Sequence, residues 1–129
     1  AVEEGIVAGG GSAYVRAGLA AEKIVSELEG DEKTGAAIVA KALEAPLVQI
    51  AVNAGLEGAV ILDRVRNSEI PGYGFDVKSE RVVNMVEAGI YDSLIVQREA
   101  VRSGIESAAL GLTIDVLVHR KKPLESVNP

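Results

Sequence analysis

The chain has 129 residues, 48% of them hydrophobic, which is enough to bury one core and predicts a single domain or part of one. It has no cysteine, so disulfides and thiolate metal sites are excluded. Its net charge of −6 repels a phosphate backbone, so nucleic acid is not expected as a partner. No apolar run approaches the roughly 20 residues of a membrane span, and the start lacks the basic residues of a signal peptide, so no membrane association is expected. There is no initiator Met, and we expect further sequence upstream of Ala1.

Two amphipathic helices are predicted in the first half of the chain. Apolar spacings of three and four residues indicate the first over residues 12–28, with Gly30 as its C-terminal stop. Its apolar line consists of Ala17, Ala21, Ile24 and Leu28. A second helix is expected to begin between Asp31 and Thr34. Its stripe consists of Val39, Leu43, Leu47, Ile50 and Ala54, and Pro46 should kink or divide it.

A shorter helix and a hairpin are predicted next. Gly55 separates the second helix from a third over residues 57–66, which carries Val60, Ile61 and Val65. Turn-forming residues are concentrated at 67–74, and the short segments 73–77 and 81–83 have the length of strands. This region therefore predicts a small β-hairpin.

The last helix is predicted after Gly89, where Asp92 or Ser93 can accept hydrogen bonds from its first amides. Its expected buried face consists of Val101, Ile105, Ala108 and Leu112. Residues 114–119 then alternate as a strand does, and such a strand needs a partner, for instance from another chain. His119 and the basic residues 120–122 are interpreted as an exposed strand end without a catalytic role. The predicted fold class is mainly α with a small β component.

Gly9, Gly10 and Gly11 directly precede the first predicted helix. Backbone without Cβ atoms can approach a ligand closely, and the first amides of a helix favour an anion. The Walker A pattern would require a Lys and a Ser or Thr after the glycines, whereas Ser12-Ala13-Tyr14 follows. A tight turn into a helix therefore stays open as the alternative interpretation.

Together with its neighbours, this glycine run resembles the chaperonin family. Residues 1–13, Ala-Val-Glu-Glu-Gly-Ile-Val-Ala-Gly-Gly-Gly-Ser-Ala, look like the signature that opens the C-terminal half of the equatorial, nucleotide-binding domain. The likeness continues in the family's order through residues 30–32, 42–50, 53–57, 72–77 and 87–92. It covers residues 1–123 and leaves 124–129 as a polar tail. The implied fold is the multihelical C-terminal half of the equatorial domain, as in GroEL-type 60 kDa chaperonins and thermosomes.

The resemblance implies that this chain builds part of an ATP site. Gly9, Gly10 and Gly11 would contact the nucleotide, Asp76 and Val77 would lie along the base and ribose, and Asp92 would reach the ribose hydroxyls. Two positions depart from the family pattern, because Asp76 stands where GroEL-type chaperonins usually have Asn, and Ser93 replaces the Pro after Asp92. In the family, the phosphate-binding loop, the Mg²⁺-binding Asp and the Asp that positions water lie upstream of this segment. No catalytic residue and no metal ligand is therefore predicted in this chain.

The branch of the family is mixed in this sequence. Residues 75–77 and 114–116 look like the archaeal and eukaryotic branch, whereas residues 42–47 look bacterial. We expect a divergent bacterial or organellar member. The resemblance implies a cytoplasmic location, with an organellar matrix or the stroma as the alternative.

Three functions are compatible with these patterns. The first is ATP-dependent protein folding within a ring subunit, with other subunits, non-native polypeptides bound by domains outside this chain, and a cochaperonin as partners. The second is a non-catalytic assembly module that does not bind nucleotide on its own. The third is a helical domain whose glycines only form turns, in which case Gly10, Asp76 and Asp92 would not gather at one place.

Overall fold

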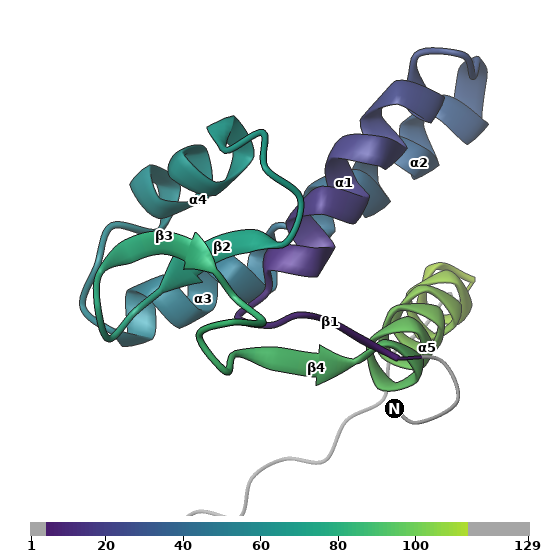
Figure 1. The fold of residues 1–129 in the computed structure, drawn as a ribbon. Helices are drawn as coiled ribbons and strands as arrows, with labels where there is room; N and C mark the ends of the chain where they lie inside the picture. Colours follow the sequence, from purple (N-terminus) through teal and green to yellow (C-terminus); the bar gives the residue numbers. More distant parts are fainter. Residues whose placement is uncertain (1–4, 114–129) are drawn as a thin grey trace, which may run out of the picture.

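The computed structural model describes residues 5–113, which form a mainly helical fold with two small sheets, as the sequence predicts (Figure 1). In chain order the elements are β1 (Ile6–Ala8), α1 (Ser12–Val25), α2 (Gly30–Ala42), α3 (Ala45–Asn53), α4 (Gly58–Asn67), β2 (Tyr73–Asp76), β3 (Arg81–Asn84), β4 (Tyr91–Ser93) and α5 (Leu94–Leu112). The predicted strand at 114–119 lies outside the described residues.

Each sheet consists of two antiparallel strands. In the first, β2 pairs with β3, with Tyr73 opposite Asn84 and Asp76 opposite Arg81, so the predicted hairpin is confirmed. In the second, β1 pairs with β4, with Val7 opposite Asp92. The sequence did not predict this second sheet, because each of its strands is three residues long and their partners are far apart in the chain. This second sheet joins the start of the described chain to the N-terminal end of α5 (Figure 1).

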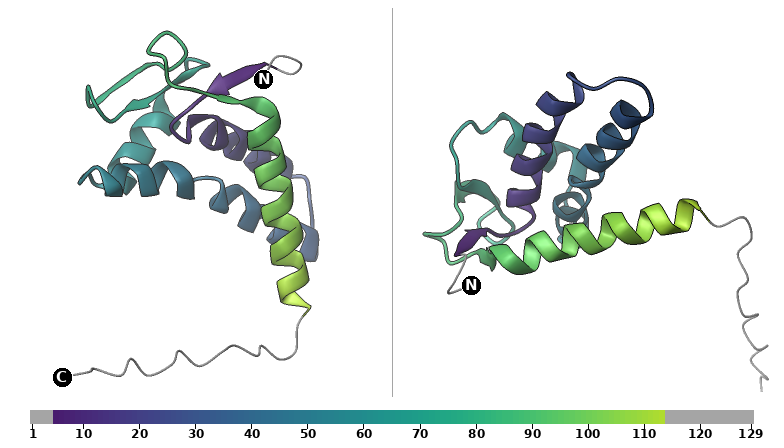
Figure 2. Two further views of the ribbon diagram at one scale, coloured as in Figure 1. Left: turned by 90° about the horizontal axis from the view of Figure 1, so that it is seen from below. Right: turned by 90° about the vertical axis from the view of Figure 1, so that its right-hand side faces the viewer.

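Helices α1 and α2 lie side by side as an antiparallel pair, which projects away from the sheets (Figure 2). The predicted apolar line of α1 is only partly correct, because Ala21 and Leu28 are half-buried but Ala17 and Ile24 are exposed, and the helix ends at Val25. The buried positions are instead Ser12, Val15 and Gly18. A Cβ at Gly18 would come 3.1 Å from the carbonyl oxygen of Ala40, so the two helices meet through a small residue that a hydrophobicity pattern does not mark.

The break between α2 and α3 occurs where Pro46 predicts it. Helix α2 ends at Ala42, and Pro46 lies in the first turn of α3, where its missing N–H removes no helical hydrogen bond. Within the described residues, Gly30–Asn53 is nevertheless long and apolar enough to pass as a membrane-spanning candidate, with a mean hydropathy of 1.5. This differs from the expectation that no apolar run approaches the length of a membrane span. Buried core helices of soluble proteins pass the same test, whereas 22% of this window is buried within the described residues, and the stretch contains Glu44, a buried carboxylate.

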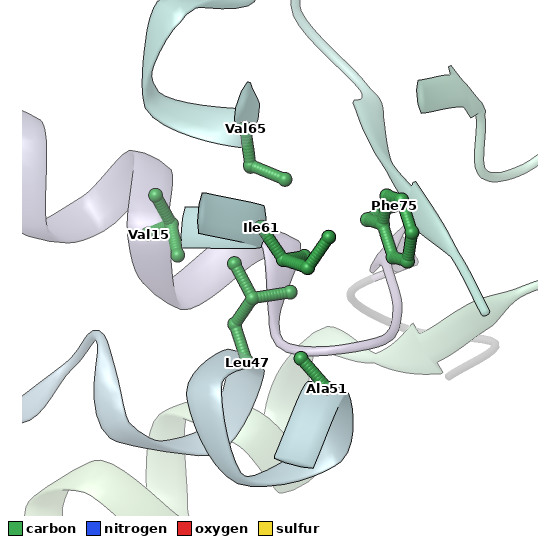
Figure 3. Packing of buried hydrophobic residues seen from close by; sticks show 6 residues of the cluster. All are labelled: Val15, Leu47, Ala51, Ile61, Val65 and Phe75. Carbon is green, nitrogen blue, oxygen red and sulfur yellow. The ribbon is translucent and has the colours of Figure 1, made fainter. Parts of the chain in front are cut away.

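The core lies where α1, α3, α4 and β2 meet (Figure 3). Its buried cluster consists of Val15, Leu47, Ala51, Ile61, Val65 and Phe75. Leu47 and Ala51 are four residues apart on α3, as are Ile61 and Val65 on α4, so each helix presents one face to the centre. Of the expected apolar stripe of the second helix, Ile50 and Ala54 are exposed, and in the third helix Val60 is exposed whereas Ile61 and Val65 are buried.

Helix α5 forms as predicted, but its expected buried face does not. Ile105 is 43% exposed and Leu112 is 89% exposed, Val101 is half-buried, and no residue of the helix is fully buried. The same face lines an apolar groove of about 720 Å³ between α5 and the α1–α3 region. The α5 residues of this groove are Ala100, Val101, Gly104, Ile105, Ala108, Ala109 and Leu112. The periodicity therefore identified the apolar face correctly, whereas its burial in this chain was a wrong prediction.

Candidate functional site

The glycine turn, residues Gly9–Gly11, connects β1 to α1. Its first residue is anchored by the hydrogen bond that the Gly9 N–H donates to the carbonyl oxygen of Ile90, 3.0 Å away, and the Ser12 N–H donates to the carbonyl oxygen of Gly9 at 3.2 Å. Gly10 and Gly11 have φ angles of 65° and 79°, in the left-handed region that a Cβ atom disfavours. Two successive residues of this kind explain why the chain has glycines here.

The turn is also too closely packed for side chains. A Cβ at Gly9 would come 3.1 Å from the carbonyl carbon of Ile90, and one at Gly11 would come 2.7 Å from the backbone nitrogen of Leu47. A Cβ at Gly10 would lie 3.1 Å from Cε of Met85, which is fully buried. The backbone of the glycine turn is therefore fixed between α3, the end of the β2–β3 hairpin and the segment that enters β4.

Ser12 and Gly74 form a second close contact beside the turn. Ser12 is fully buried, and its Oγ has no hydrogen-bond partner among the described residues. A Cβ at Gly74 would come 2.7 Å from Cβ of Ser12 and 2.9 Å from Cγ of Met85. Glycine at this strand position therefore allows the start of α1 to lie directly on β2. Gly11 is the N-cap of α1, so the helix begins without a side-chain cap.

Asp92 lies in β4, opposite Val7, and is half-buried. Burial raises the pKa of the Tyr14 phenol above its ordinary value of 10.0, and the charge of Asp92 raises it further. The Tyr14 hydroxyl donates to the carbonyl oxygen of Gln97 at 3.2 Å, which ties α1 to α5. Ser93, not Asp92, is the N-cap of α5 and makes no side-chain cap hydrogen bond. The Asp92 carboxylate is therefore not used as the helix cap.

Asp76 and Val77 lie at the end of β2, where the hairpin turn begins. Oδ1 of Asp76 accepts from the Lys78 N–H at 3.0 Å, and Oδ2 accepts from the Ser79 hydroxyl at 2.8 Å. These bonds, the Ser79 bond first, hold the pKa of Asp76 below its ordinary value of 3.8. The Val77 side chain packs against the core. The Asp76 carboxylate is therefore bonded within the hairpin turn, and the Val77 side chain is packed against the core.

The predicted site residues are connected through their neighbours in sequence. The glycine turn contacts Ile90, two residues before Asp92, and a Cβ at Gly10 would lie 3.7 Å from the carbonyl oxygen of Phe75, directly before Asp76. These contacts bring together the segments that carry the three predicted site residues. Sequence analysis missed Met85 and Ile90, which position the turn. Gly74 inside a strand was the available signal for the close backbone approach.

The chemistry of these groups fits the nucleoside end of a nucleotide. A carboxylate such as Asp92 can accept hydrogen bonds from two ribose hydroxyls, and a glycine turn presents backbone without intervening side chains. Within residues 5–113, no cluster of three or more His, Cys, Asp or Glu residues is arranged to hold a metal ion.

Two comparisons with known proteins identify the family of the chain. The sequence model of the TCP-1/cpn60 chaperonin family matches residues 1–122. Among solved structures, the chain is similar to the open-state monomer of a group II chaperonin from Methanococcoides burtonii, with 30% identity and a TM-score of 0.80 over 84% of this chain. This chain spans 28% of the length of that one. On the match over residues 1–122, the chain belongs to the TCP-1/cpn60 chaperonin family.

Proposed function

We propose that this chain is part of a subunit of an ATP-driven protein-folding ring, and that it supplies the base and ribose side of the ATP site. Gly9, Gly10 and Gly11 lie against the adenosine and phosphate end, the backbone of Asp76 and Val77 lies along the base, and Asp92 accepts from the ribose hydroxyls. Mg²⁺ and the groups that cleave ATP are held by residues outside these 129. Other subunits of the ring and non-native polypeptides are the partners in this proposal.

The observation that carries the proposal is the contact of the glycine turn with the segments that lead into Asp76 and Asp92. Gly9 bonds to Ile90, and Gly10 lies beside Phe75. A turn held in this way is rigid before any ligand arrives, which lowers the entropic cost of binding. Membership of a chaperonin family supports ATP as the ligand and a ring subunit as the context.

The first test is a calorimetric titration of the purified chain with ATP and magnesium, with sedimentation to establish its oligomeric state. We expect saturable binding in the millimolar range or tighter. Asp92→Asn keeps the shape of the side chain but removes the charge that accepts the ribose protons, so it should weaken binding about tenfold. Asp63→Asn, an exposed change on α4, is the matched control and should leave the affinity unchanged.

Two outcomes would contradict the proposal. Equal weakening by the two Asn variants would show that Asp92 acts only through overall charge. A folded, monomeric chain that binds no nucleotide would instead favour the alternative function, a non-catalytic assembly module.

A further inference from the structure

Arg66, in the last turn of α4, lies between two carboxylates from other parts of the chain. Its Nη1 donates to Oε1 of Glu44 at 2.7 Å and to Oε1 of Glu22 at 3.0 Å, and its Nη2 donates to Oε2 of Glu22 at 3.1 Å. The planar guanidinium suits this arrangement because it can bind one carboxylate with two parallel bonds while reaching a second. Arg66 thereby joins α1, α4 and the break between α2 and α3.

Glu44 is the buried member of this cluster. Its side chain is only 8% exposed, and its two oxygens are bonded separately, Oε1 to Arg66 and Oε2 to Nζ of Lys41 at 3.0 Å. Removing one partner of a buried carboxylate leaves part of its charge uncompensated, which is costly. Lys41 is 80% exposed, so Arg66 is the better-ordered of the two cations. Without Arg66, we expect the Glu44 carboxylate to move towards solvent.

A displacement of Glu44 would be transmitted to the glycine turn through the first turn of α3. Glu44 is the N-cap of α3, and its carbonyl oxygen accepts from the Val48 N–H at 3.3 Å. Leu47, in the same turn, is 1% exposed and lies so close to Gly11 that a Cβ there would come 2.7 Å from the Leu47 nitrogen and 2.9 Å from its Cα. The backbone of α3 therefore packs directly against the glycine turn.

We propose that Arg66 is a positioning residue for the glycine turn. By holding Glu44 at the start of α3, it keeps the Leu47 backbone against Gly11 and so fixes the conformation that the turn presents to its ligand. Arg66 touches no ligand in this proposal and acts through Glu44 and α3. Its effect on nucleotide affinity rests on the proposed function, whereas its effect on the turn does not.

The direct test is amide hydrogen exchange of the whole chain without nucleotide, comparing Arg66→Gln with the unmodified protein. The reporters are the amides of Ser12 and Val15, which donate to the carbonyl oxygens of Gly9 and Gly11. The reference is the amide of Leu94, which donates to the carbonyl oxygen of Gly5 at the other end of β1. We expect exchange at Ser12 and Val15 to become about tenfold faster relative to Leu94, because local opening would no longer be opposed by the ion pair.

The matched control is Arg102→Gln, which removes an arginine that pairs with Glu99 on α5, remote from the turn. It should leave all three exchange rates unchanged. Equal acceleration at Ser12, Val15 and Leu94 in Arg66→Gln would show a general loss of stability and overturn the proposal. If that variant does not fold, Arg66→Lys keeps a cation beside Glu44 but loses the fork. Arg66→Lys should then accelerate exchange at Ser12 and Val15 relative to Leu94, by less than Arg66→Gln is expected to. Equal acceleration at all three amides would again overturn the proposal.

Titration with ADP separates the two proposals. If the unmodified chain binds ADP, Arg66→Gln should bind it about tenfold more weakly and Arg102→Gln equally well. If the unmodified chain binds no ADP, the proposed function fails, and the exchange measurement alone decides whether Arg66 positions the turn. If binding is present and unaffected by Arg66→Gln while exchange changes, the link from turn to affinity is wrong.

Discussion

At Gly11, the missing Cβ atom is required both by backbone conformation and by packing. Gly55 has a φ of 80°, very close to the 79° of Gly11, but a Cβ there would meet nothing within 4 Å. Both Ala variants therefore incur a left-handed strain of roughly 1–2 kcal/mol. Gly11→Ala alone also forces a side chain into the Leu47 backbone, which adds about 1–3 kcal/mol. Urea unfolding of the two variants should show this difference, and equal losses would contradict the packing described here.

Asp76 gives a prediction for the pH dependence of stability. Its folded pKa is depressed, chiefly by the Ser79 hydroxyl and then by the Lys78 N–H. The deprotonated form is therefore favoured by folding. Its stabilising contribution is present above the ordinary value of 3.8 and is lost as the pH falls below that value through the lower folded pKa. Ser79→Ala should raise the pKa of Asp76 towards 3.8, measured by NMR titration of its carboxyl carbon. An unchanged pKa would show that the Ser79 bond does not form in solution.

At the scale of elements, the periodicity of the sequence located the helices and the hairpin but not their contacts. Pro46 and Gly55 correctly marked the boundaries of α3, because their effect on the backbone is local. Which face of a helix is buried depends on its neighbours, and here the contact positions include Ser12 and Gly18, which hydrophobicity does not mark. The β1–β4 pairing was not predictable, because strands of three residues carry too little periodic signal.

Helix α5 allows a direct comparison of a predicted and an observed core position. Ile105 was expected to be buried but is 43% exposed, whereas Leu47 is 1% exposed at the centre of the core. Ile105→Ser should therefore lower the free energy of unfolding of this chain by less than about 1 kcal/mol. Leu47→Ala should lower it by about 2–5 kcal/mol, because it leaves a cavity. Chemical unfolding of both variants gives the comparison, and similar losses would mean that α5 is packed more tightly in solution than in the structure.

For the whole molecule, the candidate site residues came from the family resemblance, whereas the core depends on contacts that periodicity does not carry. The resemblance is read residue by residue, so it assigned Gly9–Gly11 and Asp92 to a nucleotide site without knowledge of their contacts. Met85 and Ile90 could not be assigned in this way, because an apolar residue and a backbone carbonyl carry no motif, although they fix the turn in space. The same limit explains why Arg66 was missed, since its role depends on Glu22 and Glu44 meeting it from other helices.

The most direct test of the account is a residue-resolved NMR titration of the chain with ADP. If the glycine turn, the end of β2 and β4 form one nucleotide-facing surface, the largest amide shifts should occur together at residues 9–12, 75–77 and 91–93. Exposed residues of α2, such as those at 31–35, should not respond. Shifts centred on the groove beside α5, or a folded chain without any shift at millimolar ADP, would contradict the assignment of these residues to a nucleotide site.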